Sequence, residues 1–427
     1  MKEENKQQLD IENSAVVETE SEVSAAEAVS ENVQVDFVTP VEDSDKVNTV
    51  TETSSEPDAE QKARKKRKMK IVFTVLFILA MVAIIAYTAI TDFTGESMSG
   101  DSLAQTIGKN WYYLLVLLGL FAVTVLMEAL KVFLMIRKTT RTYKFGTSFC
   151  CATLGRFYDY VTPLGSGGQP FQIYYLAKHD IPSGPAGAIP LGSLILTQFS
   201  FTVCAIVSFI IGVSEEIVPI YVQILSYFGT AFYIAIPLFL LVFSFMPKAG
   251  YKVIAWGVKV LTKLRICKHP ERWIAKGNAA IDNNKKNMAI LFKSKRVLIV
   301  CTLISFVYMI ALYSMPYFSL LLFEDALIAA NLVPSWDLWF EITRITFYIH
   351  AAVAIIPTPG NSGAADGTFY GLFRSVLITV VGASFTCMMI WRFYSYYLYL
   401  ILGVIVVIYI KIADRIRAKR NQLGKLS

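Results

Sequence analysis

The sequence predicts an all-α polytopic integral membrane protein with about six full spans and two re-entrant helical hairpins. Of its 427 residues, 55% are hydrophobic and 13% are aromatic, and the mean hydropathy is +0.50. Six apolar runs are each long enough to cross a hydrocarbon core of ~30 Å. Two polar stretches rich in glycine and proline interrupt the apolar pattern. This composition excludes the classes of soluble globular protein.

The amino-terminal part of the chain has the opposite character. Its first 60 residues hold 17 of the 33 acidic residues and three lysines, so we expect residues 1–60 to be a disordered acidic tail. The basic run KARKKRKMK follows, within residues 61–70, and directly precedes the first apolar run. Basic flanks stay on the cytoplasmic side and bind anionic headgroups. We therefore expect a cytoplasmic amino terminus, held by an anchor rather than a cleaved leader.

The spans follow from continuous apolar runs. They are Ile71 to Ile90, Trp111 to Ile136, Gly187 to Val213, Ile217 to Met246, Val297 to Phe323 and Ala383 to Ile410. Lys/Arg-rich segments after Ile136, in residues 247–296 and in residues 412–427 are predicted to be cytoplasmic by the positive-inside rule. The segment 247–296 is partly amphipathic, and we expect it to lie along the inner membrane surface. The transmembrane domain thus covers residues 71–411, and the basic carboxyl-terminal tail is inside.

This orientation is consistent only if two further segments enter and leave on the same side. The first, about residues 147–178, would enter from inside, and the second, about residues 336–382, from outside. Three spans separate them, so the second hairpin is inverted relative to the first, as in transporters built from inverted repeats. The alternative is that Leu338 to Ile356 crosses fully, which would place the carboxyl terminus outside.

Each hairpin contains a Gly/Pro stretch, DYVTPLGSGGQP and IPTPGNSGAADGTF. Proline lacks a backbone donor and glycine permits tight turns, so we expect backbone groups that are free for a polar ligand. The helices that begin after Gly168 and Gly363 would direct partial positive charge to a phosphate. A hairpin that merely packs is the alternative. The candidate binding residues of the two stretches are Thr162, Pro163, Gly167, Gly168, Gln169, Pro357, Pro359, Gly360 and Gly363.

Ionisable residues inside apolar regions are further candidates, because a charge there costs at least ~2.5 kcal/mol unless it is paired or faces a cavity. Arginine binds phosphate bidentately. We expect Arg156, Arg344 and Arg392 to face the cavity, Asp159 to contribute to binding, and Asp366 and Glu128 to be counter-charges or proton acceptors. Self-contained ion pairs are the alternative, since Arg156 and Asp159 are three residues apart, as are Glu341 and Arg344.

Three of the ionisable residues also have simpler interpretations. Glu128 and Lys131 lie late in a span and could both reach the inner interface. His350 is one of three histidines, so it has no partners for a metal site and is expected to pack, with a proton relay as the alternative. The six cysteines are scattered without a CxxC pair, which predicts neither disulfides nor zinc. We expect no metal and no cofactor.

Both motifs together, in this order and with spans on either side, resemble the lysylphosphatidylglycerol synthase transmembrane-region family of flippase-like membrane proteins. The matching positions are Thr162, Pro163, Gly167, Gly168, Gln169 and Pro170, then Pro357, Thr358, Pro359, Gly360, Gly363 and Asp366. The resemblance covers about residues 71–410, and the acidic position is more often Glu in the family. Because the sequence ends about 17 residues after its last predicted span, we expect no soluble aminoacyltransferase domain of the kind that the bifunctional members have. The resemblance therefore implies the lipid-translocating part alone, in a bacterial cytoplasmic membrane.

The expected function is translocation of a polar lipid, such as a modified phospholipid or glycolipid, through a polar cavity between the hairpins. The sequence has no GxxxxGK[ST] loop, so movement would be downhill or coupled to protons or an ion, with Asp366 the first candidate. The expected partners are the lipid substrate and anionic headgroups, not nucleic acid; a homo-oligomer and a separate lipid-modifying enzyme are left open. One alternative is a membrane transferase that modifies a lipid headgroup, although the sequence contains no G-x-S-x-G or HExxH motif. The other is a scaffold that recruits partners through its acidic tail.

Overall fold

The computed structural model describes residues 100–162, 165–213, 218–263, 270–354, 356, 358–377 and 383–423. The chain divides into residues 1–60 and 61–427, and every described residue belongs to the second unit. All the elements within these ranges are helical, as predicted. The predicted tail, the basic segment and the first span lie outside the described residues, and so do Pro163 and Pro357.

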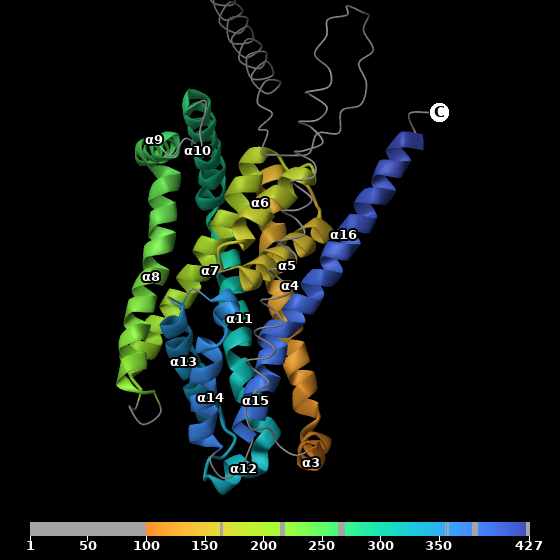
Figure 1. Ribbon diagram of the computed structural model, residues 1–427, viewed down its shortest axis with the longest axis vertical. Helices are drawn as coiled ribbons and strands as arrows, with labels where there is room; N and C mark the ends of the chain where they lie inside the picture. The colour runs from red at the N-terminus through yellow and green to blue at the C-terminus, as the bar shows by residue number, and fades with distance from the viewer. Residues whose placement is uncertain are drawn as a thin grey trace, which may run out of the picture. The chain divides into compact units, whose positions relative to one another are not determined.

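Five helical segments in the described ranges are long and apolar enough to cross a membrane (Figure 1). They are α4 (Tyr112–Thr140), α7 (Ser183–Ile211), α8 (Ile220–Phe245), α11 (Lys295–Leu320) and the segment made by α15 (Ala383–Arg392), the π-helical turn η4 (Phe393–Tyr397) and α16 (Leu398–Leu423). Each coincides with one of the predicted spans from the second to the sixth, so these five predictions are confirmed. The last helix continues beyond Ile410, since the following Lys, Arg and Ala residues are good helix formers.

The other helices are shorter. They are α3 (Gly100–Asn110), α5 (Phe145–Val161), α6 (Gly168–Lys178), α9 (Pro247–Lys263), α10 (Pro270–Lys293), η2 (Leu321–Phe323), α12 (Glu324–Ala329), α13 (Trp336–Val353), η3 (Pro359–Asn361) and α14 (Ala364–Val376). The first Gly/Pro stretch joins α5 to α6, and the second joins α13 to α14. With 11 and 13 residues, α6 and α14 are too short to cross a ~30 Å core at ~1.5 Å per residue.

These two helix pairs lie at different ends of the bundle. In Figure 1, α5 and α6 lie toward the end that carries α9 and α10, whereas α13 and α14 lie toward the end that carries α12. The turn η3 nevertheless packs against α5. The two Gly/Pro stretches, far apart in the sequence, therefore meet in the interior.

Close helix packing holds the bundle together. Helix α4 packs against α5 and α11, and α8 packs against α7 and α13. Gly229 of α8 lies so close to the carbonyl of Ala351 in α13 that a Cβ would overlap it. Beside it, the Ser226 hydroxyl donates a hydrogen bond to the carbonyl of Tyr348 at 2.7 Å. Small residues at such contacts are typical of helices packed in membranes.

The segment predicted as an amphipathic surface loop forms α9 and α10, which pack against each other. Helix α10 also packs against α7 and α8, and it buries Met288 and Leu291 completely or nearly so. Part of this segment thus belongs to the helical core, a feature that the amphipathic pattern alone did not predict.

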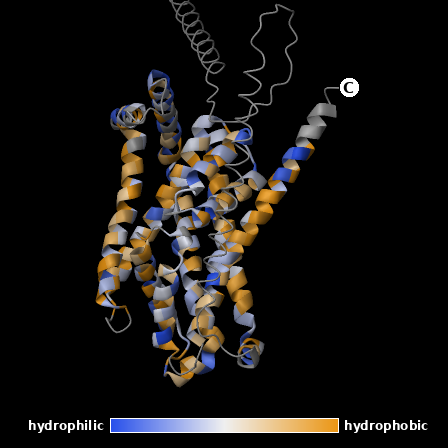
Figure 2. Ribbon diagram, viewed as in Figure 1, coloured by the Kyte–Doolittle hydropathy of each residue, from blue (hydrophilic) through white to orange (hydrophobic). Residues whose placement is uncertain are grey.

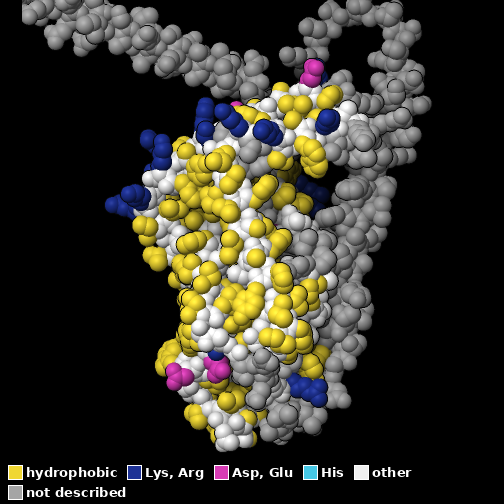
Figure 3. Space-filling model, turned by 90° about the vertical axis from the view of Figure 1, so that its left-hand side faces the viewer, with side chains coloured by type: hydrophobic (Ala, Val, Ile, Leu, Met, Phe, Trp, Pro, Cys, Tyr) yellow, Lys and Arg dark blue, Asp and Glu magenta, His cyan; other side chains and the backbone are white. Residues whose placement is uncertain are grey.

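Helix α8 consists mainly of hydrophobic residues (Figure 2), and hydrophobic side chains cover much of the face shown in Figure 3. Ile210 is 80% exposed and Phe228 is 66% exposed. Exposure of such large apolar side chains to water is unfavourable, whereas their contact with the hydrocarbon core of a bilayer is not. On the face shown in Figure 3, Lys and Arg side chains gather at the end with α9 and α10. The described surface therefore has the apolar belt and basic end of a membrane protein.

Candidate functional site

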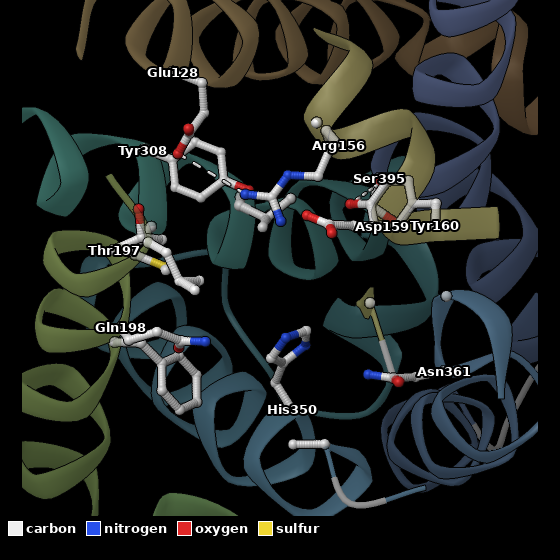
Figure 4. A pocket seen from close by; sticks show the side chains of 18 of the residues that line it. Glu128, Arg156, Asp159, Tyr160, Thr197, Gln198, Tyr308, His350, Asn361 and Ser395 are labelled. Carbon is white, nitrogen blue, oxygen red and sulfur yellow. Dashed lines mark hydrogen bonds and ion pairs between the residues drawn. The ribbon is translucent and has the colours of Figure 1, made fainter. Parts of the chain in front are cut away.

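A cavity of about 490 Å³ lies where the helices α4 to α8, α11 and α13 to α15 converge with the turns η3 and η4. Its volume is in the range of small-molecule binding sites. Charged side chains line it together with aromatic ones, and Figure 4 shows the polar groups arranged around an open centre. Of the predicted binding or coupling residues, the lining includes Glu128, Arg156, Asp159, Gln169, Gly360 and Arg392.

Arg156 of α5 extends its guanidinium into this space. Figure 4 shows the guanidinium between Glu128 and Asp159. Its Nη2 is 3.9 Å from Oε1 of Glu128, and its Cζ is 5.1 Å from the ring centroid of Tyr308. Among the described residues, none accepts a hydrogen bond from Arg156. Its N–H donors are therefore available to an anionic ligand.

The first Gly/Pro stretch is closed by its own side chains. Asp159 accepts a hydrogen bond from the N–H of Gly168 at 2.9 Å, and the Thr162 hydroxyl oxygen accepts one from the N–H of Gly167, also at 2.9 Å. A Cβ on Gly168 would overlap Asp159, so the close approach requires glycine. The expectation that these N–H groups are free for a ligand is wrong, because a helix start without water must satisfy its donors internally.

The second Gly/Pro stretch is held by a buried ion pair. Nε of Arg392 is 2.9 Å from Oδ1 of Asp366, and both side chains are more than nine-tenths buried. Nη2 of Arg392 also donates to the carbonyl of Gly360 at 3.2 Å and to the hydroxyl of Ser362 at 2.6 Å. The other oxygen of Asp366 accepts a hydrogen bond from the N–H of Gly363 at 2.7 Å. Arg392 borders the cavity, but these donors face the loop.

Positive φ angles explain the glycines of this loop. Pro359 opens the turn η3, and Gly360 within it has φ +58°. A Cβ on Gly360 would also overlap the ring of Tyr396. Gly363, with φ +81°, directly precedes α14. These backbone angles are strained for other residues, and the N–H of Gly363, like those of the first loop, is taken by a protein acceptor.

Arg344 is not among the residues that line the cavity. Its Nη1 donates to the carbonyl of Gly212, directly after the end of α7. A helix end leaves such carbonyls without partners, and a cation there is favourable. The alternative of self-contained ion pairs is wrong, because in the described part of the chain neither Arg156 with Asp159 nor Glu341 with Arg344 is close enough to form one. The pairing partners come from other elements instead.

Sequence reasoning missed several residues of the site. Lys131, which could have reached the interface, has a completely buried side chain whose Nζ is 2.8 Å from Glu128 Oε1. Glu128 and Lys131 are three residues apart in α4, a spacing that could have indicated this ion pair. No comparable signal indicated the π-helical turn, whose Ser395 and Tyr396 line the cavity. Such turns are frequent at functional sites.

His350 borders the cavity from α13. Its ring centroid is 5.0 Å from that of Tyr313 and 5.8 Å from that of Phe201, so it packs among aromatic rings, as expected. Within the described ranges, no group of His, Cys, Asp and Glu side chains is arranged to hold a metal ion.

Comparisons with known proteins give one match. The model of the family described as lysylphosphatidylglycerol synthase TM region matches residues 70–403. Neither the curated proteins nor the solved structures contain a match.

Proposed function

Because this chain belongs to the lysylphosphatidylglycerol synthase transmembrane-region family, we propose that it translocates a polar lipid across the cell membrane through the cavity. Membership supports a role related to membrane lipids. Translocation itself rests on the site: an anion-binding arginine lies inside a bundle whose outer surface is apolar. A modified phospholipid or a glycolipid has a polar headgroup that suits such a lining.

The observation that carries the proposal is the environment of Arg156. Its guanidinium faces a cavity of about 490 Å³, and no described residue accepts a hydrogen bond from it. A buried or partly buried arginine is costly unless charged or polar groups complement it. A phosphate oxygen of a headgroup would supply the missing acceptors in bidentate geometry. The aromatic residues Phe201, Tyr308 and Tyr313 extend the lining with apolar surface for the remainder of the lipid.

Two re-entrant hairpins are part of the same proposal. The pair α5–α6 would enter from the cytoplasmic side and the pair α13–α14 from the outside. The short helices and their location at different ends of the bundle support this arrangement (Figure 1). The basic α9 and α10 lie at the end where α16 finishes, which supports a cytoplasmic carboxyl terminus by the positive-inside rule.

The proposed movement needs no nucleotide. It is downhill or coupled to protons or another ion, and Asp366 and Glu128 stay the candidates for coupling. Each already has a cationic partner, Arg392 and Lys131 respectively, so protonation of either carboxyl group would release a cation. A separate enzyme would make the lipid that this chain moves.

Transbilayer movement of a panel of labelled lipids in proteoliposomes tests the proposal. The panel contains anionic, zwitterionic and glycosylated lipids, with the wild-type chain compared with Arg156→Gln. We expect one class to move, and Arg156→Gln to slow it at least about tenfold, the effect of losing a charge-assisted hydrogen bond.

The matched control is Arg374→Gln, the same change at an exposed arginine of α14 that does not line the cavity. It should move lipid at the wild-type rate. Movement no faster than in empty liposomes, or equal rates for wild type and Arg156→Gln, would contradict the proposal.

A further inference from the structure

Lys131 is a cation enclosed by the bundle, and its side chain is completely buried in the middle of α4. An ammonium group has three donors and no acceptor. The Nζ atom contacts three oxygens: Glu128 Oε1 at 2.8 Å, the Thr197 hydroxyl, and the Ser305 hydroxyl at 3.4 Å. These come from α4, α7 and α11, so all the donors of Lys131 have partners on three separate helices.

The same oxygen of Glu128 also faces Arg156. Its Oε1 is 2.8 Å from Nζ of Lys131 but 3.9 Å from Nη2 of Arg156, the second distance being beyond a hydrogen bond. One carboxylate therefore lies between two cations and is bonded to only one of them. Glu128 and Arg156 line the cavity, whereas Lys131 is not among the lining residues.

Asp159, the other carboxylate beside Arg156, is also engaged. Its Oδ1 accepts the hydrogen bond from Gly168 that closes the first Gly/Pro stretch. With Glu128 held by Lys131 and Asp159 held by the loop, Arg156 donates no hydrogen bond to either acidic group and is only within ion-pair range of Glu128. A guanidinium at 3.9 Å from a carboxylate would otherwise close the gap, because Arg–carboxylate pairs favour direct bidentate contact.

We propose that Lys131 is a positioning residue that holds Glu128 away from Arg156 and so keeps the guanidinium free for an anionic group of the lipid. This rests on the proposed function. Lys131 itself does not touch the lipid. Without Lys131, Glu128 turns to Arg156 and the lipid anion has to compete with a carboxylate of the protein.

The test compares Lys131→Met, which keeps the volume of the side chain but removes its charge, with the double variant Lys131→Met/Glu128→Gln. Movement of the anionic lipid in proteoliposomes should fall at least about tenfold in Lys131→Met, because one charge-assisted contact is lost. With no ion gradient imposed, the double variant should recover most of this downhill movement, since no carboxylate then competes for Arg156 and no coupling group is needed. Lys109→Met, at an exposed lysine on α3, is the matched control and should not change movement.

A binding measurement keeps the inference separate from translocation. Glycerol phosphate is titrated into the detergent-solubilised protein, with the fluorescence of tryptophan, which includes the cavity residue Trp391, as the signal. We expect binding by the wild type and the double variant, and at least about tenfold weaker binding by Lys131→Met.

The outcomes distinguish the two proposals. If no lipid moves but glycerol phosphate binds with this pattern, translocation fails and the role of Lys131 holds. If Lys131→Met binds and moves lipid like the wild type, the inference is wrong. It is also wrong if the double variant is folded, as judged by size-exclusion chromatography, yet stays as impaired as Lys131→Met, because Lys131 would then be only structural.

Discussion

At the residue scale, the most informative contact is the buried ion pair between Arg392 and Asp366. Arg392 binds Asp366, Gly360 and Ser362 at once, and its guanidinium lies 4.3 Å from the ring centroid of Tyr396. A single side chain of α15 thus fixes the loop that joins α13 to α14. Because both charges are buried, each depends on the other for its solvation.

We predict that Arg392→Gln destabilises the protein, because Asp366 is left as an unpaired buried carboxylate. Removing one partner of a buried ion pair costs about 3 kcal/mol. The midpoint of thermal unfolding in detergent, followed by tryptophan fluorescence, should fall. The double variant Asp366→Asn/Arg392→Gln should recover part of the loss, since it contains no unpaired charge. A midpoint for Arg392→Gln equal to that of the wild type would show that the buried ion pair is not needed for stability.

Charge within apolar segments was a good predictor of which residues border the cavity. Glu128, Arg156, Asp159 and Arg392 were all named from the sequence and all line it. Lys131, the partner of Glu128, lies three residues on in the same helix, but the partners of Arg156 and Arg392 were not predictable, because those ion pairs join residues from different elements. Arg344 had the same sequence signal but bonds to the end of α7. Whether a buried arginine serves a ligand or a helix end depends on tertiary structure.

At the element scale, the two helical hairpins decide the topology. Helices α5 and α6 are joined by a loop that uses Asp159 and Thr162 as caps, and α13 and α14 are joined by the loop that Arg392 holds. In both loops, side chains of the same helix pair accept the hydrogen bonds of the glycine N–H groups just before or at the start of α6 and α14, which favours irregular chain inside a membrane protein. These glycines are therefore not open backbone sites for a ligand.

We predict that the two ends of each hairpin lie on the same side of the membrane. Cysteines introduced at Tyr143 and Asp180 flank α5–α6, while for α13–α14 one is introduced at Val333, before α13, and one at Ser375, in the last turn of α14; all four positions are exposed. In intact cells, a membrane-impermeant thiol reagent should label Val333→Cys and Ser375→Cys, and should label Tyr143→Cys and Asp180→Cys only after permeabilisation. The unmodified chain gives the background of its own cysteines. Opposite sides for the two members of either pair would contradict the re-entrant arrangement.

Hydropathy predicted the existence of the five described spans because a bilayer demands a continuous apolar helix. It did not predict where the last span ends, or the π-helical turn between α15 and α16. These details depend on contacts with other helices. The prediction of free backbone groups at the glycines failed for a local reason, since Asp159 and Thr162 lie nine and five residues before the glycines whose N–H groups they bind.

At the scale of the whole described bundle, the cavity results from helices of both halves of the sequence. Helices α4, α5, α6 and α7 contribute from the first half, while α8, α11, α13, η3, α14, α15 and η4 contribute from the second. Sequence analysis predicted a polar cavity between the two Gly/Pro stretches, and η3 does pack against α5. It did not predict the aromatic share of the lining, because Tyr308, Tyr313 and Tyr233 lie in helices with no distinguishing motif.

If lipid passes through this cavity, as we propose, blocking the cavity stops its movement. Leu194 lines the cavity from α7, whereas Ile210, later on the same helix, is 80% exposed and does not. Lipid movement would be measured for Leu194→Cys and Ile210→Cys before and after complete modification with a bulky thiol reagent, with the unmodified chain as control. We predict that modification stops movement in Leu194→Cys and leaves it unchanged in Ile210→Cys. Undiminished movement in fully modified Leu194→Cys would show that lipid takes another route.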